Sequence, residues 1–126
     1  MQRVMLKSKI HRARVTGSDL HYIGSLTVDP TLLAAADILE HERIAVVDVD
    51  NGARFETYAI AGERDSGTIE VNGAAARLVH HGDTIIVFSY GYYDEDEVSR
   101  QVPRVVHVDE RNRIVAVDER ASTLAT

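Results

Sequence analysis

The sequence predicts a mainly β fold, in the form of a small closed six-stranded barrel with one or two short helices. Apolar and polar residues alternate along most of the chain, which is the period of half-buried strands. An Asn-Gly pair separates two alternating segments, and one further segment carries the start signals of a helix. At least six strands in 126 residues favour a barrel, because closure leaves no exposed strand edges.

The first predicted strands lie before Gly17, at residues 3–7 and 13–16, where apolar and polar side chains alternate. A helix follows in the segment TLLAAADILE. Asp29 is expected as its N-cap, because a carboxylate oxygen can accept the free N–H groups of the first turn. Pro30 is expected at the first helical position, where a missing N–H costs nothing.

Residues 44–50 and 53–61 are predicted to form a β-hairpin around Asn51 and Gly52. Both turn residues readily adopt positive φ, so we expect a type I′ turn. The last two predicted strands form another hairpin around residues 110–112. The remaining predictions are strands at Gly67–Val71, Thr84–Tyr90, Arg104–Asp109 and Arg113–Val117 and a short helix at Asp94–Gln101.

Composition indicates one acidic domain over residues 1–126, with 14 Lys and Arg against 20 Asp and Glu. The lack of Cys excludes a disulfide framework, a thiolate metal site and a cysteine nucleophile. No apolar run approaches the roughly 18 residues of a membrane span, and no signal peptide is apparent in the first residues. We therefore expect a soluble protein of the cytoplasm that does not act on a membrane.

Charge is distributed unevenly along the chain. Residues 1–24 hold five cations and one anion, whereas residues 25–126 hold nine cations and nineteen anions. The basic segment is compatible with a nucleic-acid arm or with a strand whose cations line a pocket for an acidic small molecule. The commonest role of such a run is a solvated strand face that pairs with acidic neighbours. The net charge of −6 opposes nucleic-acid binding.

Common catalytic motifs are absent from the sequence, including a P-loop, a dinucleotide-binding glycine motif and HExxH. No metal site is expected, because His80 and His81 would point to opposite sides of a strand and the acidic residues 94–97 suit a helix start. Gly24-Ser25 offers a more specific chemistry. A serine hydroxyl can attack the carbonyl of the residue before it, and glycine does not obstruct a distorted peptide there.

Several motifs occur in an order and spacing that resemble a known family, the bacterial aspartate 1-decarboxylases, which depend on a pyruvoyl group. The resemblance extends over most of the chain and is weak beyond Pro103. The motifs that carry it are Met5-Leu6, Lys9-Ile10-His11-Arg12, Val15-Thr16, Asp19-Leu20-His21-Tyr22, Gly24-Ser25, Asn51-Gly52, Arg54-Phe55, Thr57-Tyr58-Ala59-Ile60-Ala61, Glu63-Arg64, Val71-Asn72-Gly73-Ala74-Ala75-Ala76 and Gly82-Asp83.

The resemblance implies a double-ψ β-barrel that cuts itself between Gly24 and Ser25. Residues 1–24 would become a small chain, and residues 25–126 a larger chain that begins with a pyruvoyl group made from Ser25. This cofactor would form a Schiff base with L-aspartate and release CO2, giving β-alanine for pantothenate synthesis. The family assembles as a homotetramer with active sites between subunits, so the same is expected of this chain.

The resemblance also implies roles for individual residues. Ser25 and Tyr58 are the expected catalytic residues, with the Tyr58 phenol returning the proton to the substrate. Thr57 is expected to act with Gly24 and Ser25 in self-cleavage and to lie near the substrate. Arg54 is expected to hold a substrate carboxylate. The other expected substrate-binding residues are Lys9 and His11, which add positive charge, and Asn72, Gly73, Ala74 and Ala75, which line the substrate through backbone N–H groups.

Successive side chains of a strand point to opposite faces, which tests part of these roles independently of the resemblance. Lys9 and His11 share one face of a strand, as do Arg54 and Tyr58, whereas Thr57 faces the opposite way. Two other functions stay open at this point. One is a small β-barrel binding module, and the other is a barrel that never matures into an enzyme.

Overall fold

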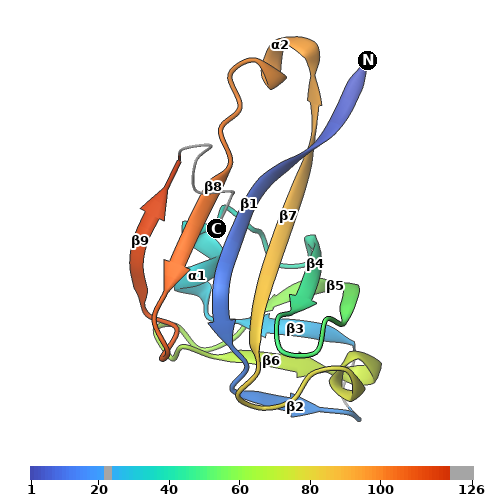
Figure 1. The fold of residues 1–126 in the computed structure, drawn as a ribbon, viewed down its shortest axis with the longest axis vertical. Coiled ribbons are helices and arrows are strands. Elements are labelled where there is room, and N and C mark those ends of the chain that lie inside the picture. Colours follow the sequence, from blue (N-terminus) through green and yellow to red (C-terminus); the bar gives the residue numbers. More distant parts are fainter. Residues whose placement is uncertain (22–23, 120–126) are drawn as a thin grey trace.

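The computed structural model describes residues 1–21 and 24–119. Within these residues the fold is mainly β, as predicted, and contains two short α-helices and one 3₁₀ helix (Figure 1). In chain order the elements are β1 (Gln2–Arg14), β2 (Gly17–Asp19), β3 (Ser25–Val28), α1 (Pro30–Ala35), β4 (Arg43–Asp48), β5 (Arg54–Ala61), β6 (Ile69–Asn72), η1 (Gly73–Arg77), β7 (Thr84–Asp94), α2 (Glu95–Val98), β8 (Arg104–Val108) and β9 (Ile114–Asp118).

The strands form one sheet in the order β2-β6-β3-β5-β4-β7-β1-β8-β9. The β2 strand continues β1 after only Val15 and Thr16, whose N–H groups donate to Asp83 O and Ile69 O. The chain therefore pairs with β7 through β1 and with β6 through β2. This continuity closes a ring of six strands, in which β1 and β2 count as one. The β8–β9 hairpin lies outside the ring and pairs with β1 through a parallel ladder.

The β1 strand corrects the prediction of two strands before Gly17. It is a single strand of 13 residues whose pairing with β7 shifts register between Leu6 and Ser8 and again between Ile10 and Ala13. Arg12 lies in the second irregularity and has a φ of 62°. A bulge of this kind reverses the alternation of side chains. The alternating sequence pattern is therefore interrupted at Arg12 although the strand continues.

The helix after Asp29 begins as predicted but is shorter. Asp29 accepts the N–H of Thr31, and Pro30 is the first helical residue. The helix stops early because Asp37 has a φ of 55° and Ile38 N–H donates to Leu33 O, which together form a left-handed Schellman end. This turn directs Ile38 into the core beside Leu33.

The β4–β5 hairpin is confirmed, but its type I′ turn is wrong. Gly52 has a φ of 78°, whereas Asn51 has no positive φ. The buried Asp48 side chain accepts the N–H groups of Asp50 and Asn51, and Gly52 N–H donates to Asp48 O. This side-chain capping stabilises a longer loop in place of the two-residue turn.

Strands β6, β7, β8 and β9 lie close to their predicted positions, whereas β2, β3 and η1 were not predicted. The predicted helix after residue 93 is present as α2, and the acidic residues form its exposed start. Asp94 and Glu97 make a reciprocal capping box there. The first part of β1, the end of β7 and α2 extend together away from the barrel (Figure 1).

The core lies inside the barrel, where alternate residues of the strands meet. Helix α1 covers part of it with Leu32 and Leu33. No helix of the described residues is long and apolar enough to cross a membrane. The strand residues of the core that are completely buried are Ile10, Ala13, Leu26, Val28, Val46, Ala59, Ile69, Val71, Ile85, Val87 and Val106.

Candidate active site

Ser25 is the first residue of β3 and is only 1% exposed. Asn72 lies directly opposite on β6, and its Nδ2 donates to Ser25 Oγ at 3.1 Å. Gly24 is exposed, and a Cβ there would meet nothing within 4 Å. The structure thus holds the serine hydroxyl in a defined place, next to a peptide that is open on its glycine side.

Tyr58 lies beside Ser25 on the neighbouring strand. In the parallel ladder Leu26 is paired with Ala59, so the residues before them, Ser25 and Tyr58, stand at the same level. Leu26 and Ala59 point into the core, so alternation places Ser25 and Tyr58 together on the opposite face. Tyr58 is half-buried, with its ring 6.5 Å from that of His41. The predicted catalytic pair is therefore brought together.

Thr57 faces the other side of β5, as its alternation with Tyr58 predicts. It pairs with Ile44 of β4, which is a core residue. Residues directly opposite in an antiparallel ladder share a face, so Thr57 is directed towards the barrel interior. The two neighbouring residues thus reach different environments.

The segment after Asn72 begins next to Ser25. Asn72 is 3% exposed and ends β6. Gly73 has a φ of 76°, a conformation that favours glycine, and it starts η1. Ala74 is exposed, while Ala75 packs against the core. The predicted lining segment is therefore close in the fold to the cleavage pair, because Asn72 is the ladder partner of Ser25.

Lys9 and Arg54 converge on one aromatic ring. Lys9 pairs with Phe88 across the β1–β7 ladder, and its Nζ lies 5.9 Å from the ring centroid. Arg54 approaches the same ring with its Cζ 6.0 Å from the centroid. Tyr90 stacks on Phe88 at 6.4 Å. The two predicted substrate-binding cations thus come from distant strands to one surface.

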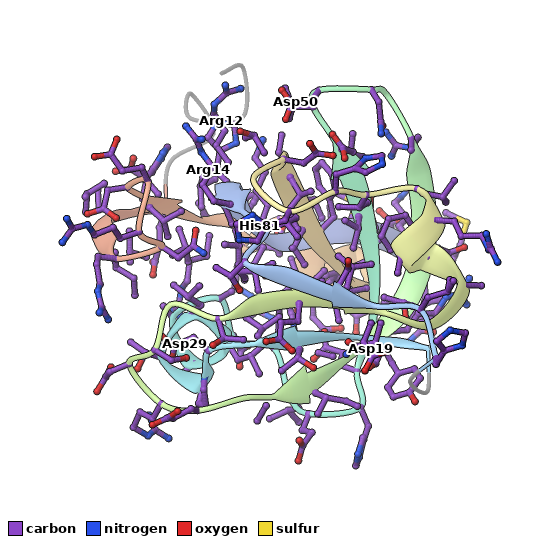
Figure 2. The ribbon with its side chains drawn as sticks, turned by 90° about the horizontal axis from the view of Figure 1, so that it is seen from below. Arg12, Arg14, Asp19, Asp29, Asp50 and His81 are labelled. Atoms are coloured by element: carbon purple, nitrogen blue, oxygen red, sulfur yellow. The ribbon has the colours of Figure 1, made fainter. Side chains whose placement is uncertain are left out.

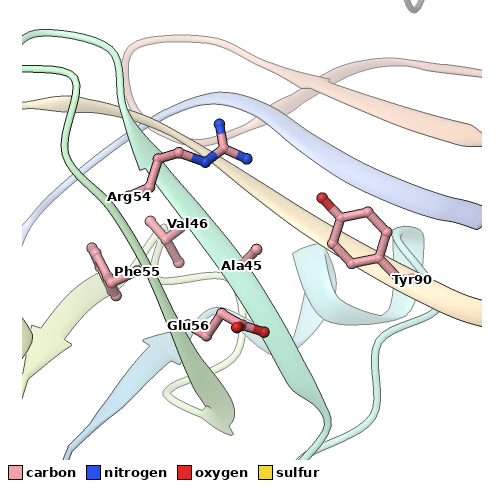
Figure 3. A pocket seen from close by; sticks show the side chains of 6 residues that line it. All are labelled: Ala45, Val46, Arg54, Phe55, Glu56 and Tyr90. Carbon is pink, nitrogen blue, oxygen red and sulfur yellow. The ribbon is translucent and has the colours of Figure 1, made fainter. Parts of the chain in front are cut away.

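A cavity of about 400 Å³ opens beside this surface. Figure 3 shows Arg54 and Glu56 reaching it from β5 and Tyr90 from β7, with the Tyr90 hydroxyl directed to the side on which Arg54 lies. Ala45, Val46 and Phe55 complete its lining. A cavity of this size accommodates a small dicarboxylate, and Arg54 supplies it with a permanent positive charge. The negative charge of Glu56 is offset by its ion pair with Arg43 at 2.7 Å.

Lys9 is the most unusual residue of the candidate site. It lies on the same face as Phe88, yet only 6% of the residue is exposed. Among the described residues no carboxylate forms an ion pair with its ammonium, which lies over the Phe88 ring. A buried charge without a partner is costly, and such groups occur where a ligand brings the opposite charge. The position of Lys9 therefore points to an anionic ligand.

His11 lines a second cavity, of about 330 Å³, which neither Lys9 nor Arg54 lines. Arg12, Arg14 and His107 also line that cavity (Figure 2 shows both arginines at the end of β1). Burial, followed by the positive charge of Lys9, lowers the pKa of His11. Its ring lies edge-on to that of His107 at 5.6 Å. The imidazole is thus held towards its neutral form.

The predicted site residues therefore form three separate groups within one chain. Ser25, Tyr58 and Asn72 meet at β3, Lys9 and Arg54 meet at Phe88, and His11 lines another cavity beside His107. Arg54 and Tyr58 share a face of β5, and their Cα atoms are four residues apart, about 13 Å along an ideal strand.

Two residues near the site were missed by sequence reasoning. Phe88 follows the core residue Val87 in a predicted strand, so the alternation of side chains could have predicted its outward position. Thr27, which accepts from Asn72 Nδ2 at 2.9 Å, could not be found because β3 was not predicted.

Two of the basic residues at the start of the chain pair with acidic neighbours. Arg3 pairs with Glu95 at 2.9 Å, and Lys7 pairs with Glu42 at the same distance. These two cations match the interpretation of a strand face that pairs with acidic neighbours.

Three carboxylates meet at the ends of β4 and β7, a group that sequence reasoning missed. Asp48, Asp50 and Asp83 each place one oxygen within 4.8 Å of the others. Burial, followed by contact with Asp83, raises the pKa of Asp48, while the hydrogen bond with Asp48 lowers the pKa of Asp83. A proton held mainly by Asp48 and donated to Asp83 explains the arrangement.

Asp48→Asn is expected to raise the free energy of unfolding at pH 8 and to leave it nearly unchanged at pH 4. A raised pKa stabilises the fold below the unfolded value, near 3.8, and this stability is lost as pH rises through the folded pKa. The lowered pKa of Asp83 acts in the opposite sense and only at lower pH. An Asn amide can donate to Asp83 at every pH. The variant should therefore not show the decrease in the free energy of unfolding that the wild type shows as pH rises.

Urea unfolding of both proteins across this range measures the difference, with the exposed Glu110→Gln as the control. A variant that is less stable than the wild type at pH 8 would contradict the shared proton.

Comparison with known proteins supports the resemblance noted in the sequence. The family model described as aspartate decarboxylase matches residues 1–115. The chain is 58% identical over 117 residues to aspartate 1-decarboxylase of Moorella thermoacetica, covering 93% of this chain and 91% of that protein. Among solved structures, the computationally designed protein msDPBB_sym2 is 13% identical, with a TM-score of 0.47, over 69% of this chain and 96% of that one. The match over nearly the whole chain shows that this protein belongs to the aspartate decarboxylase family.

Proposed function

We propose that this protein decarboxylates L-aspartate to β-alanine in the cytoplasm, after it cuts itself between Gly24 and Ser25. The observation that carries the proposal is the buried Ser25 hydroxyl, which Asn72 holds beside an open glycine peptide and next to Tyr58. Membership of the aspartate decarboxylase family supports the choice of substrate.

Self-cleavage uses only atoms of the chain and water. Ser25 Oγ attacks the Gly24 carbonyl carbon and loses its proton, and the peptide C–N bond breaks to leave an ester and a free amine. Elimination then releases the Gly24 carboxylate and leaves a carbon–carbon double bond at residue 25. Hydrolysis of the resulting enamine releases ammonia and leaves a ketone. One water is consumed and one ammonia is lost in total.

The residues around Ser25 fit this chemistry. The Asn72 amide lies where it can stabilise negative charge as the hydroxyl loses its proton. Burial of Ser25 limits competition from bulk water. The ketone would thus form at a protected strand start.

The two fragments would stay together through strand pairing. Residues 1–24 contain β1 and β2, which pair with β7, β8 and β6 of the larger fragment. Ile10 and Ala13 of the small fragment are also completely buried in the shared core. These ladders and core contacts stabilise the association far more than exposed charge does.

A pyruvoyl ketone at residue 25 supplies a carbonyl for the substrate amine and withdraws electrons from the carbon that loses CO2. The chain's own residues do the rest. Arg54 offers two parallel N–H donors to a substrate carboxylate, and Lys9 adds a second positive charge for a doubly negative substrate. Tyr58, level with Ser25, donates the proton that replaces CO2.

The proposal includes a homotetramer with active sites between subunits. Within one chain Lys9 and Arg54 gather at Phe88, whereas Ser25 and Tyr58 lie together at β3. A neighbouring subunit could bring its own Lys9 and Arg54 to this Ser25. The separation of the groups within one chain supports such an arrangement.

Incubation of the cleaved protein with L-aspartate tests the proposal. We expect CO2 and β-alanine in equal amounts and no reaction with D-aspartate or L-glutamate. A fully cleaved preparation that makes no β-alanine would rule out the proposed activity.

Lys9→Met is expected to raise KM for L-aspartate about tenfold or more, because a buried cation that meets a carboxylate contributes about 1.5–3 kcal/mol. The same change should leave the free energy of unfolding equal or higher, since it removes an unpaired buried charge. Steady-state kinetics and urea unfolding measure the two effects. Lys7→Met serves as the control for loss of a paired lysine. A normal KM together with lower stability would assign Lys9 a purely structural role.

A further inference from the structure

Thr27 shares the Asn72 amide with Ser25. Asn72 Nδ2 carries two N–H groups, and it lies 3.1 Å from Ser25 Oγ and 2.9 Å from Thr27 Oγ1. Ser25 and Thr27 are two residues apart on β3 and therefore point to the same face. One buried amide thus has both of its hydrogens engaged by hydroxyl groups of one strand.

We propose that Thr27 is a positioning residue for self-cleavage, which acts by orienting the Asn72 amide towards Ser25. The inference rests on the proposed cleavage at Gly24-Ser25. Thr27 does not touch the reacting bond in this account. It acts through the amide alone.

The physical reason is the freedom of an asparagine amide to rotate about its last side-chain bond, whose preferences are broad. A single hydrogen bond to Ser25 leaves much of this freedom. A second acceptor at 2.9 Å fixes the plane of the amide, so that the other N–H is aimed at Ser25 Oγ. Without Thr27 Oγ1, a hydrogen of a nearly fully buried amide would lack an acceptor, which favours rotation away from this geometry.

Thr27 is itself held from a second side. A Cβ placed on Gly62 would lie only 2.9 Å from Thr27 Cγ2, so the absent side chain at Gly62 makes room for the threonine methyl. A β-branched side chain has few χ1 states. With its methyl beside Gly62, the hydroxyl is directed to Asn72. Gly62 and Asn72 together therefore select one orientation of Thr27.

A different role for Thr27 is substrate binding. It lines a cavity of about 320 Å³ together with Asn72, Asp19 and Glu70. The two carboxylates make that cavity unsuitable for a doubly negative substrate, which favours the role in cleavage. The two roles predict different kinetic effects, because one changes the rate of maturation and the other changes KM.

The test compares the maturation of freshly purified Thr27→Val, Thr27→Ser and wild-type chains. Denaturing electrophoresis and intact mass follow the loss of the uncut chain over time. Valine keeps the shape but removes the acceptor, so we expect cleavage to slow about tenfold or more. Serine keeps the acceptor and should restore cleavage to within about twofold of the wild type, whereas a merely structural methyl would not allow this rescue. KM for L-aspartate is measured on each protein after complete cleavage.

Equal cleavage rates for Thr27→Val and the wild type would overturn the inference. So would a Thr27→Ser rate as slow as that of Thr27→Val, and normal cleavage with a raised KM would assign Thr27 to substrate binding instead. If Thr27→Val melts below the assay temperature, Thr27→Ala replaces it with the same expectation. Failure of the wild-type chain to cleave would refute the proposed function, which is a distinct result.

Discussion

Ser25→Ala is expected to remain a single chain of 13.9 kDa with no measurable decarboxylase activity. The substitution removes the only atom that can attack the Gly24 carbonyl in the proposed reaction, so neither the cut nor the ketone can form. The fold should persist, because the change deletes one hydroxyl from a strand whose pairing with β5 and β6 is unaffected. The expected effect is therefore complete loss of function without loss of structure.

Denaturing electrophoresis, thermal melting and a CO2-release assay on the same preparation measure this result. Ser99→Ala is the matched control, since its hydroxyl caps the exposed end of α2 and should not affect maturation. Retained activity in uncut Ser25→Ala would contradict the account.

Tyr58→Phe is expected to separate maturation from turnover. Cleavage should proceed, because Ser25 and Asn72 keep their contact. Turnover should fall about 10²- to 10⁴-fold, the usual contribution of a positioned proton donor. KM should change little, because the substrate carboxylates are assigned to Arg54 and Lys9. The loss would therefore appear in kcat.

Steady-state kinetics on the cleaved variant provide the measurement. Tyr92→Phe is a suitable control, since Tyr92 is 72% exposed near the end of β7, where the strand extends away from the barrel. Unchanged turnover in cleaved Tyr58→Phe would remove Tyr58 from the role of proton donor.

Features that depend on neighbouring residues could be predicted from the sequence. Asp29 and Pro30 start a helix through local hydrogen bonding and a fixed φ, and the structure shows both. The capping box at Asp94 is equally local. The end of α1 was predicted less well, because the left-handed Asp37 is stabilised by burial of Ile38 in the tertiary core.

Features that depend on distant pairing could not be predicted. The short β3 strand exists because β5 and β6 flank it, and four residues starting with Ser25 carry little alternation. The contact of Ser25 with Asn72 joins residues 47 positions apart. The resemblance to the family identified Ser25 and Asn72 as site residues. Only the fold shows that they contact each other and that Thr27 contacts Asn72.

The separation of the site residues into groups also depends on distant pairing, so it could not be predicted from the sequence. Alternation placed Arg54 and Tyr58 on one face but could not show that Lys9 shares Phe88 with Arg54. It also grouped Lys9 with His11, which the fold directs to another cavity near a bulge.

Intact-mass spectrometry of the wild-type chain, fresh and after incubation, tests the origin of the cofactor most directly. We expect two fragments, residues 1–24 and 25–126, whose masses add up to the uncut chain plus one water and minus one ammonia. A chain that stays whole in a preparation with decarboxylase activity, or a larger fragment of an active enzyme that still begins with an unmodified serine, would contradict the account.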